Sequence, residues 1–226
     1  MTCVTPEVQH TLKPDVLAMR LIPNVHPGMA EQFGLKPTEK SIALITANID
    51  DPLYIGGDEA TKQADVRVAY CHSHYAGGNY PSGPLSGEAL LVLAAPNPAE
   101  ATAGLNAVVA VLDGTRYGTI ELVQPKGLLA WLAYTIAAPG SYLAEAANAQ
   151  PGQAIAYLAA PPLEGVYAIE RALKSADVQI GAFTKPPSET NYCGALLVGT
   201  QSACRAACRA FEEGVIAVAT APTAFQ

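Results

Sequence analysis

Charged side chains are scarce in this chain, and the scarcity excludes some partners. Only 15% of the 226 residues are Asp, Glu, Lys or Arg, and the formal net charge is −7. No nucleic-acid partner is expected, because phosphate binding needs a basic stripe. Half of the residues are apolar, which provides ample material for packed cores and for surfaces buried against protein partners. A mildly acidic surface or pore would favour cationic or neutral solutes.

Long apolar runs and targeting signals are also missing. The longest apolar run, around residues 89–95, is far shorter than a membrane span, so no membrane association is expected. The N-terminus has no basic region followed by an apolar stretch. The five cysteines lack the spacing of a disulfide framework. These features predict a cytoplasmic protein with reduced thiols.

Catalytic and cofactor motifs are absent from the sequence. There is no nucleophile elbow, no P-loop and no G-x-G-x-x-G after a strand. The four histidines cannot be placed in a Ser-His-Asp or Cys-His arrangement by spacing. Cys204 and Cys208 are four residues apart on a predicted helix, but Phe211 and Val215 continue the same stripe, which favours core packing over a metal site. We therefore expect neither an enzyme nor a bound cofactor.

One short cluster offers metal ligands. His72 and His74 would share one face of a strand, which makes metal binding geometrically possible. No third ligand is evident, so a polar loop or an assembly axis is the favoured interpretation. A site completed by other subunits stays open as an alternative.

What the chain does contain is a long internal repeat. Asp58–Val66 is echoed by Glu170–Val178, at an offset of 112 residues taken as Lys174 minus Lys62. Strand-like runs flank both copies, at 42–45 and 87–92 for the first and at 155–158 and 194–198 for the second. A period of about half the chain indicates a duplicated domain. Two similar domains in one chain suggest a symmetric assembly that imitates a ring of single domains.

The repeat divides the chain into an N-terminal arm at 1–14, a first domain at 15–114 and a second at 115–226. A strand is predicted at 16–22 and a short helix at 29–33. Asn97 and Pro98 are typical of a helix start, and Gly114 of its end. In the second half we expect a strand at 120–123, a helix at 128–137, a loop at 139–143 and a helix from about Ser202. The N-terminal arm at 1–14 is expected to be loosely held.

Several longer motifs carry a family resemblance. They are, in chain order, 58–64, 96–100, 140–143, 160–164, 172–178 and 186–192. Together these motifs resemble the tandem-domain shell proteins of the bacterial microcompartment for ethanolamine utilisation, over about residues 17–219. The resemblance implies an α/β (α+β) fold of two duplicated, circularly permuted shell domains, each with a small antiparallel sheet flanked by helices.

The same resemblance implies an assembly and a function. The family forms homotrimers shaped like hexagons, which pack side by side with other shell proteins around metabolic enzymes. A central pore that can open and close lies on the threefold axis, and each subunit has a smaller pore. A small amino-alcohol metabolite is the implied solute. The expected location is therefore the shell of a microcompartment in the cytoplasm.

Residue by residue, the resemblance assigns two groups of positions. The small pore and its ligand take Asp50, Asp51, Tyr75, Glu88, Tyr117 and Thr190. The central gate takes Gly140, Ser141 and Tyr142. The repeat itself suggests Lys62 and Lys174 as equivalent residues of a lateral interface. From the residues alone, Asp50 and Asp51 fit turn capping equally well, and Glu88 fits an edge charge. The chain departs from the family pattern at Ala138-Pro139, which replaces Arg-Thr before the gate motif, and at Arg116.

Three other functions remain in competition. The same tile in a different compartment would handle another amino alcohol or a diol. A sensor built from duplicated α/β domains would bind a small molecule or a metal, with His72 and His74 as ligands. A hydrolase is disfavoured because no motif supports one.

Overall fold

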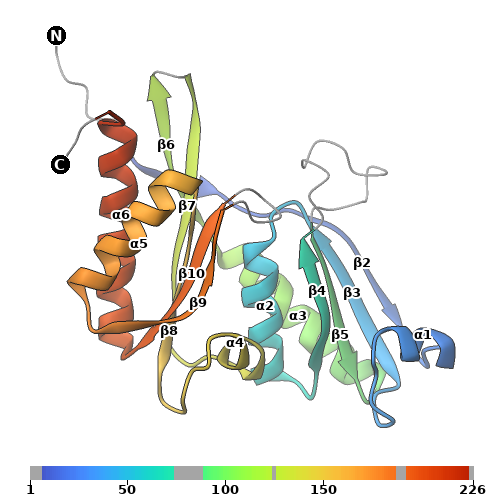
Figure 1. The fold of residues 1–226 in the computed structure, drawn as a ribbon. Helices are drawn as coiled ribbons and strands as arrows, with labels where there is room; N and C mark the ends of the chain where they lie inside the picture. Colours follow the sequence, from blue (N-terminus) through green and yellow to red (C-terminus); the bar gives the residue numbers. More distant parts are fainter. Residues whose placement is uncertain (1–6, 74–88, 124–125, 187–191, 224–226) are drawn as a thin grey trace. The chain divides into compact units, whose positions relative to one another are not determined.

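The computed structural model describes residues 7–73, 89–123, 126–186 and 192–223. The chain divides into two compact units (Figure 1). Unit 1 consists of Met1–Leu12, Arg116–Ala138 and Ala146–Gln226, and unit 2 of Lys13–Thr115 and Pro139–Glu145. Each unit has a hydrophobic core of its own. The division means that a short piece of the second half of the sequence belongs to the unit built by the first half.

Unit 2 contains a four-stranded antiparallel sheet with the strand order β2-β3-β5-β4. Its elements are β2 (Val16–Ile22), α1 (Pro27–Gln32), β3 (Ser41–Ala47), α2 (Asp51–Gln63), β4 (Arg67–Ser73), β5 (Ala89–Ala95) and α3 (Pro98–Gly114). The helix α4 (Ser141–Ala146) contributes its first five residues to this unit. The helices α2 and α3 pack on each other and on the sheet.

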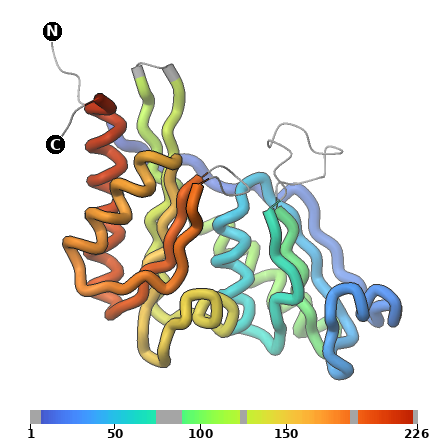
Figure 2. Tube along the Cα trace, viewed as in Figure 1, coloured from blue at the N-terminus to red at the C-terminus, as the bar shows by residue number. Residues whose placement is uncertain are grey.

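Unit 1 contains a six-stranded antiparallel sheet with the order β1-β6-β7-β8-β10-β9. Its elements are β1 (Gln9–Leu12), β6 (Tyr117–Val123), β7 (Lys126–Ile136), β8 (Ala154–Ala160), α5 (Pro162–Ser175), β9 (Val178–Thr184), β10 (Cys193–Gly199) and α6 (Gln201–Thr220). The helices α5 and α6 pack together, and α6 covers β7 and β8. Figure 2 shows β1, near the blue start of the chain, running toward the yellow-green β6 with which it pairs.

The two units repeat one topology. The sheet order β2-β3-β5-β4 in unit 2 corresponds to β7-β8-β10-β9 in unit 1, with α2 and α5, and α3 and α6, at the same points of the chain order. The duplication predicted from the sequence is therefore confirmed as a structural repeat. The α+β class with two antiparallel sheets and flanking helices is confirmed as well.

Local signals explain where several elements begin. The side chain of Asn97 accepts a hydrogen bond from the backbone N–H of Glu100 at 3.0 Å, and Pro98 occupies the first helical position of α3. Thr200 caps α6 in the same way, by accepting from the N–H of Ala203 at 3.2 Å. Such caps satisfy N–H groups that have no partner within the helix.

Three sequence-based expectations for the second half and the N-terminus need correction. Residues 128–137, expected as a helix, lie mostly in β7, because this strand is hydrogen-bonded on both edges, to β6 and to β8. A continuous apolar run is compatible with either a buried helix or a buried strand, and only the pairing decides between them. The supposed loop at 139–143 includes the first turn of α4, and part of the supposedly loose arm is β1.

Candidate functional site

Asp50 and Tyr54 lie at the start of α2 and meet the end of β4. The Ser73 hydroxyl donates a hydrogen bond to Asp50 Oδ2 at 2.5 Å, and the Tyr54 hydroxyl lies 3.2 Å from Ser73 Oγ. Asp50 is the N-cap residue of α2 by position, but its side chain makes no capping hydrogen bond. The turn-capping interpretation of Asp50 is therefore wrong, because its carboxylate accepts a hydrogen bond from Ser73 at the end of β4 instead.

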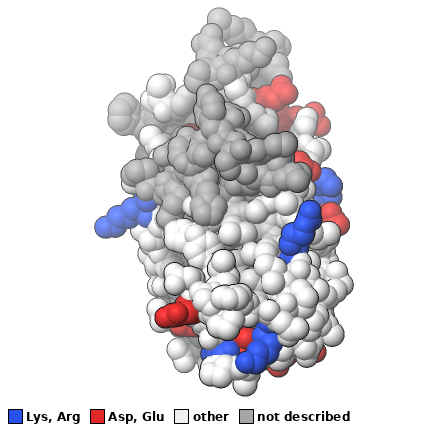
Figure 3. Space-filling model, turned by 90° about the vertical axis from the view of Figure 1, so that its right-hand side faces the viewer, with Lys and Arg blue, Asp and Glu red and all other residues white. Residues whose placement is uncertain are grey.

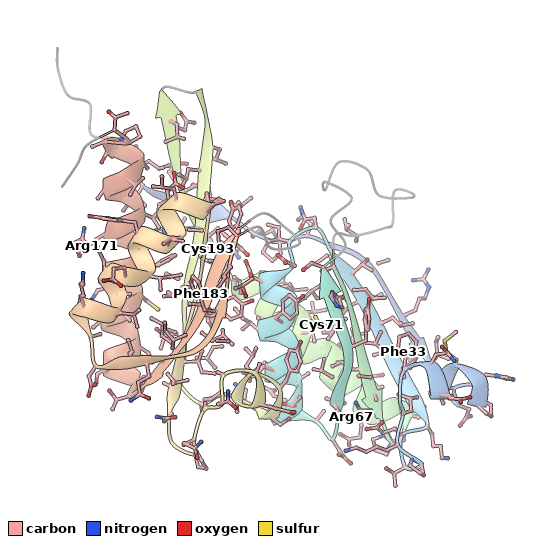
Figure 4. All side chains as sticks on the ribbon, in the orientation of Figure 1. Phe33, Arg67, Cys71, Arg171, Phe183 and Cys193 are labelled. Atoms are coloured by element: carbon pink, nitrogen blue, oxygen red, sulfur yellow. The ribbon has the colours of Figure 1, made fainter. Side chains whose placement is uncertain are left out.

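Tyr142 extends this group of polar side chains. Its hydroxyl interacts with the thiol of Cys71, which lies on β4 two residues before Ser73 (Figure 4). Burial raises the pKa of Tyr142 and of Cys71 well above their ordinary values, and burial raises the pKa of Tyr54 to about 12. Both phenols and the thiol are therefore protonated at neutral pH. We call Asp50, Tyr54, Cys71, Ser73 and Tyr142 the α2–β4 polar cluster.

The α2–β4 polar cluster contains residues from both predicted groups, the small pore and the central gate. Asp50 was assigned to the small pore and Tyr142 to the central gate, yet both belong to one set of interacting side chains in unit 2. Sequence reasoning missed Tyr54, Cys71 and Ser73. The spacing of four residues between Asp50 and Tyr54 on α2 could have indicated Tyr54, whereas no local signal indicates Cys71 or Ser73.

The gate segment is attached to α2 by its backbone. The N–H groups of Gly140 and Leu143 donate to the two carboxylate oxygens of Asp58, at 2.7 and 2.8 Å. The N–H of Ser141 donates to Thr61 Oγ1 at 3.1 Å. Asp58 is 1% exposed, so this carboxylate satisfies two N–H groups away from water. A Cβ at position 140 would collide with the Asp58 backbone and the Thr61 side chain, so only glycine fits there.

The other predicted pore residues are distributed over both units and over residues that the structure does not describe. Asp51 is the first residue of α2. Tyr117 begins β6 in unit 1 and is 3% exposed, so it is largely inside that unit. Tyr75, Glu88 and Thr190 lie outside the described residues.

The two lysines occupy equivalent places in the repeat. Lys62 lies in the last turn of α2 and forms an ion pair with Glu59. Lys174 lies in the last turn of α5, and its Nζ is 2.7 Å from the carboxylate of Glu170. The Lys174 side chain is much more exposed than that of Lys62. The hydrogen bond with Glu170 raises the pKa of Lys174.

The cysteine pair on α6 belongs to the core of unit 1. Cys204 is fully buried, and its thiol donates to the carbonyl of Ala154 at 3.4 Å. Cys208 lies in the same hydrophobic core as Phe211 and Val215. The core-packing interpretation of this stripe is thus confirmed.

His72 is an exposed residue of β4, and its ring centroid lies 5.6 Å from that of Tyr70. His74 lies outside the described residues. Within the described ranges, no three His, Cys, Asp or Glu side chains are grouped so that they could hold a metal ion. Nor does any helix in the described ranges have the length and apolar character needed to cross a membrane.

Comparison with known proteins places the chain in a family. No family model matches it. It is 46% identical over 214 residues to the bacterial microcompartment shell protein EutL of Clostridium perfringens, covering 95% of this chain and 98% of the relative. The crystal structure of EutL from the same organism superposes with a TM-score of 0.89 at 44% identity, covering 98% of this chain and 99% of that one. The chain belongs to the EutL family of shell proteins.

A second EutL structure agrees. The ethanolamine utilization protein EutL from Leptotrichia buccalis is 46% identical, with a TM-score of 0.88 over 95% of this chain and 98% of that chain. Membership in the EutL family makes this chain a structural shell protein of a bacterial microcompartment and not an enzyme. The resemblance drawn from the sequence motifs is therefore confirmed.

Proposed function

We propose that this EutL-family chain forms homotrimeric, pseudohexameric tiles of a microcompartment shell for ethanolamine utilisation. The tiles pack beside other shell proteins, and their gated pores pass small metabolites. The observation that carries the proposal is the repeated topology of units 1 and 2. Three chains with two like units each supply six units, which is the number that a hexagonal tile requires.

The surface composition supports a protein that packs against copies and partners. Among the described residues in view in Figure 3, scattered Lys, Arg, Asp and Glu side chains lie on a mostly uncharged surface. Large apolar side chains are exposed at several positions in the chain, among them Met29, Leu128 and Leu163. Burial of such residues in interfaces would remove apolar area from water.

The ethanolamine proposal rests on the relatives and on charge. A relative at 46% identity is an ethanolamine utilization protein, and an amino alcohol carries an ammonium group that carboxylates attract. We assign the small pore to Asp50, Asp51, Tyr75, Glu88, Tyr117 and Thr190. We assign the central gate to Gly140, Ser141 and Tyr142. A gate is supported by the way this segment is attached, through the side chains of Asp58 and Thr61 and not through strand pairing.

The oligomeric state tests the tile directly. Native mass spectrometry of the purified chain is expected to show a trimer, and electron microscopy is expected to show hexagonal arrays. Only monomers or dimers at micromolar concentration would contradict the proposal.

The lateral interface can be tested in the same experiment. Because Lys62 and Lys174 are proposed to line tile edges, replacing both with alanine is expected to reduce array formation while trimers persist. Arrays that are unchanged in the double variant would remove the two lysines from the interface.

The pore ligand gives a further prediction. Replacing Glu88 with Gln is expected to weaken ethanolamine binding by roughly 1–3 kcal/mol, because a charge-assisted hydrogen bond is lost. Isothermal titration of both proteins measures this difference, and Glu121→Gln, on β6, is a control with the same change in charge. Equal affinities of the Glu88→Gln variant and the unmodified chain would exclude Glu88 from the site.

A further inference from the structure

The connections β2–β3 and β7–β8 are equivalent parts of the repeat. Each contains one six-residue helix, α1 or α4, that begins five positions after the last residue of the preceding strand, at Pro27 after Ile22 and at Ser141 after Ile136. Each helix is followed, two positions after its end, by a residue with a left-handed backbone. This residue is Gly34 after α1, with φ 59°, and Asn148 after α4, with φ 51°.

The same register aligns side chains. Met29-Ala30-Glu31 on α1 corresponds to Leu143-Ala144-Glu145 on α4, at an offset of 114 residues. The two equivalent apolar residues have different environments. Leu143 is 3% exposed, whereas Met29 is 48% exposed.

The β7–β8 connection, which contains α4, packs against a helix of unit 2. Its residues 139–145 belong to unit 2, although the strand before them belongs to unit 1. Its backbone N–H groups bind Asp58 on α2, and Leu143 is its buried apolar residue. The connection of one repeat is thus docked on the helix of the other repeat.

The α1 segment is held in place on its own unit, but among the described residues no apolar side chain of α1 is buried as Leu143 is. Arg67 on β4 donates to the carbonyl of Gly34 at 3.0 Å and pairs with Glu39 at 2.7 Å. The ring of Phe33 packs edge-on against Tyr70, with centroids 6.2 Å apart. Figure 4 shows Phe33 and Arg67 on the side of unit 2 that carries α1. No residue of α1 is buried, so the helix is positioned on its own unit with its apolar side chain uncovered.

The helix α5 has the complementary open face. The offset of 112 aligns the buried residues Gly56 and Ala60 of α2 with the buried Ala168 and Ala172 of α5. The same offset aligns Asp58 with Glu170. Asp58 is 1% exposed beneath the α4 segment, whereas the Glu170 side chain is 57% exposed. The face of α5 that carries Glu170 is therefore open where the matching face of α2 is covered.

We propose that α1 of one chain docks on the Glu170 face of α5 in a second copy of the chain. Met29 then takes the place of Leu143 against the partner helix, and the Glu170 side chain lies beside it. The N–H groups of Gly28 and Met29 have acceptors on His26, so the contact is made by side chains. The contact joins unit 2 of one chain to unit 1 of the next, which is a head-to-tail interface that can close into a ring. The inference rests on the proposed trimeric tile and names the surfaces that would hold it together.

Cross-linking between two different single variants tests the contact. Met29→Cys and a tagged Glu170→Cys chain, both with Cys3→Ser, are co-expressed and treated with a short bismaleimide. The native thiols at 71, 193, 204 and 208 have pKa values raised by burial and should react slowly. A covalent pair of tagged and untagged chains joined at 29 and 170 is expected. Glu31→Cys, two positions away on the helix, replaces Met29→Cys as the control and should give little product.

A charge variant tests the same surface through the stability of the trimer. Met29→Glu would face Glu170 and is expected to raise the concentration at which trimers dissociate about tenfold or more. Adding Glu170→Lys to Met29→Glu should restore the trimer, while Met29→Leu should leave it unchanged. Trimers that persist without the 29–170 link, and without an effect of Met29→Glu, would overturn this interface but not the tile. A monomeric unmodified chain would overturn both.

Discussion

Replacing Asp58 with alanine is expected to lower the free energy of unfolding by roughly 2–5 kcal/mol, because two buried N–H groups lose their charged acceptor. These groups are the backbone N–H of Gly140 and of Leu143. Urea denaturation at one protein concentration measures the loss, and hydrogen exchange locates it. Amides of the segment 140–143 are expected to exchange much faster in Asp58→Ala, because the segment opens locally.

Two further variants separate the carboxylate from the rest of the contact. Asp58→Asn keeps one acceptor oxygen and should have an intermediate effect. Thr61→Val removes the hydrogen bond that the Thr61 hydroxyl accepts from the more exposed N–H of Ser141 and the one that it donates to the Asp58 carbonyl. Because neither involves a charged group, this variant should cost less than Asp58→Ala. Unchanged exchange of the Gly140 and Leu143 amides in Asp58→Ala would show that Asp58 does not hold the gate segment.

The Phe211→Ala variant is expected to lose roughly 3–5 kcal/mol of unfolding free energy, because it leaves a cavity in a close-packed core. Phe211 is fully buried on α6, in the core of unit 1. The shift of the urea midpoint at constant slope measures this loss.

Phe211→Leu provides the matched control. It keeps most of the apolar volume and should cost only about 1–2 kcal/mol. If Phe211→Ala cost no more than Phe211→Leu, the site would have collapsed around the smaller side chain, and the prediction of a persistent cavity would be wrong.

Elements with strong local signals were predictable from the sequence. The helix α3 begins at an Asn-Pro start and ends at Gly114, because a cap and a terminating glycine act within a few residues of the backbone that they satisfy. The strands on either side of the repeated motif were predictable for a similar reason. Their apolar runs are short and bounded by turn residues.

The strand β7 was not predictable in this way. Its run of apolar residues has no clear period, since Leu129 and Trp131 are buried on one side and Leu132 on the other. Its identity as a strand depends on hydrogen bonds to β6 and β8, which lie before and after it in the chain. Pairing between separate strands cannot be predicted from a short window of sequence.

The candidate site shows the same limit. The family motifs identified Asp50 and Tyr142, but their shared polar cluster depends on Cys71 and Ser73 from a strand that is distant in sequence from Tyr142. Asp58 was visible only as part of a repeated helix. Its role as the acceptor for the gate segment depends on hydrogen bonds from Gly140 and Leu143, which lie 82 and 85 positions after it in the sequence.

The sequence by itself determined the duplication, the helix caps and the EutL family, because these depend on residue identity, local spacing and long collinear motifs. Only the tertiary structure decided that β7 is a strand, that residues 139–145 belong to unit 2, and that no residue of α1 is buried whereas Leu143 of α4 is. Each of these depends on which surfaces meet in space. That meeting is set by burial and hydrogen bonding between segments far apart in the chain, which no local pattern encodes.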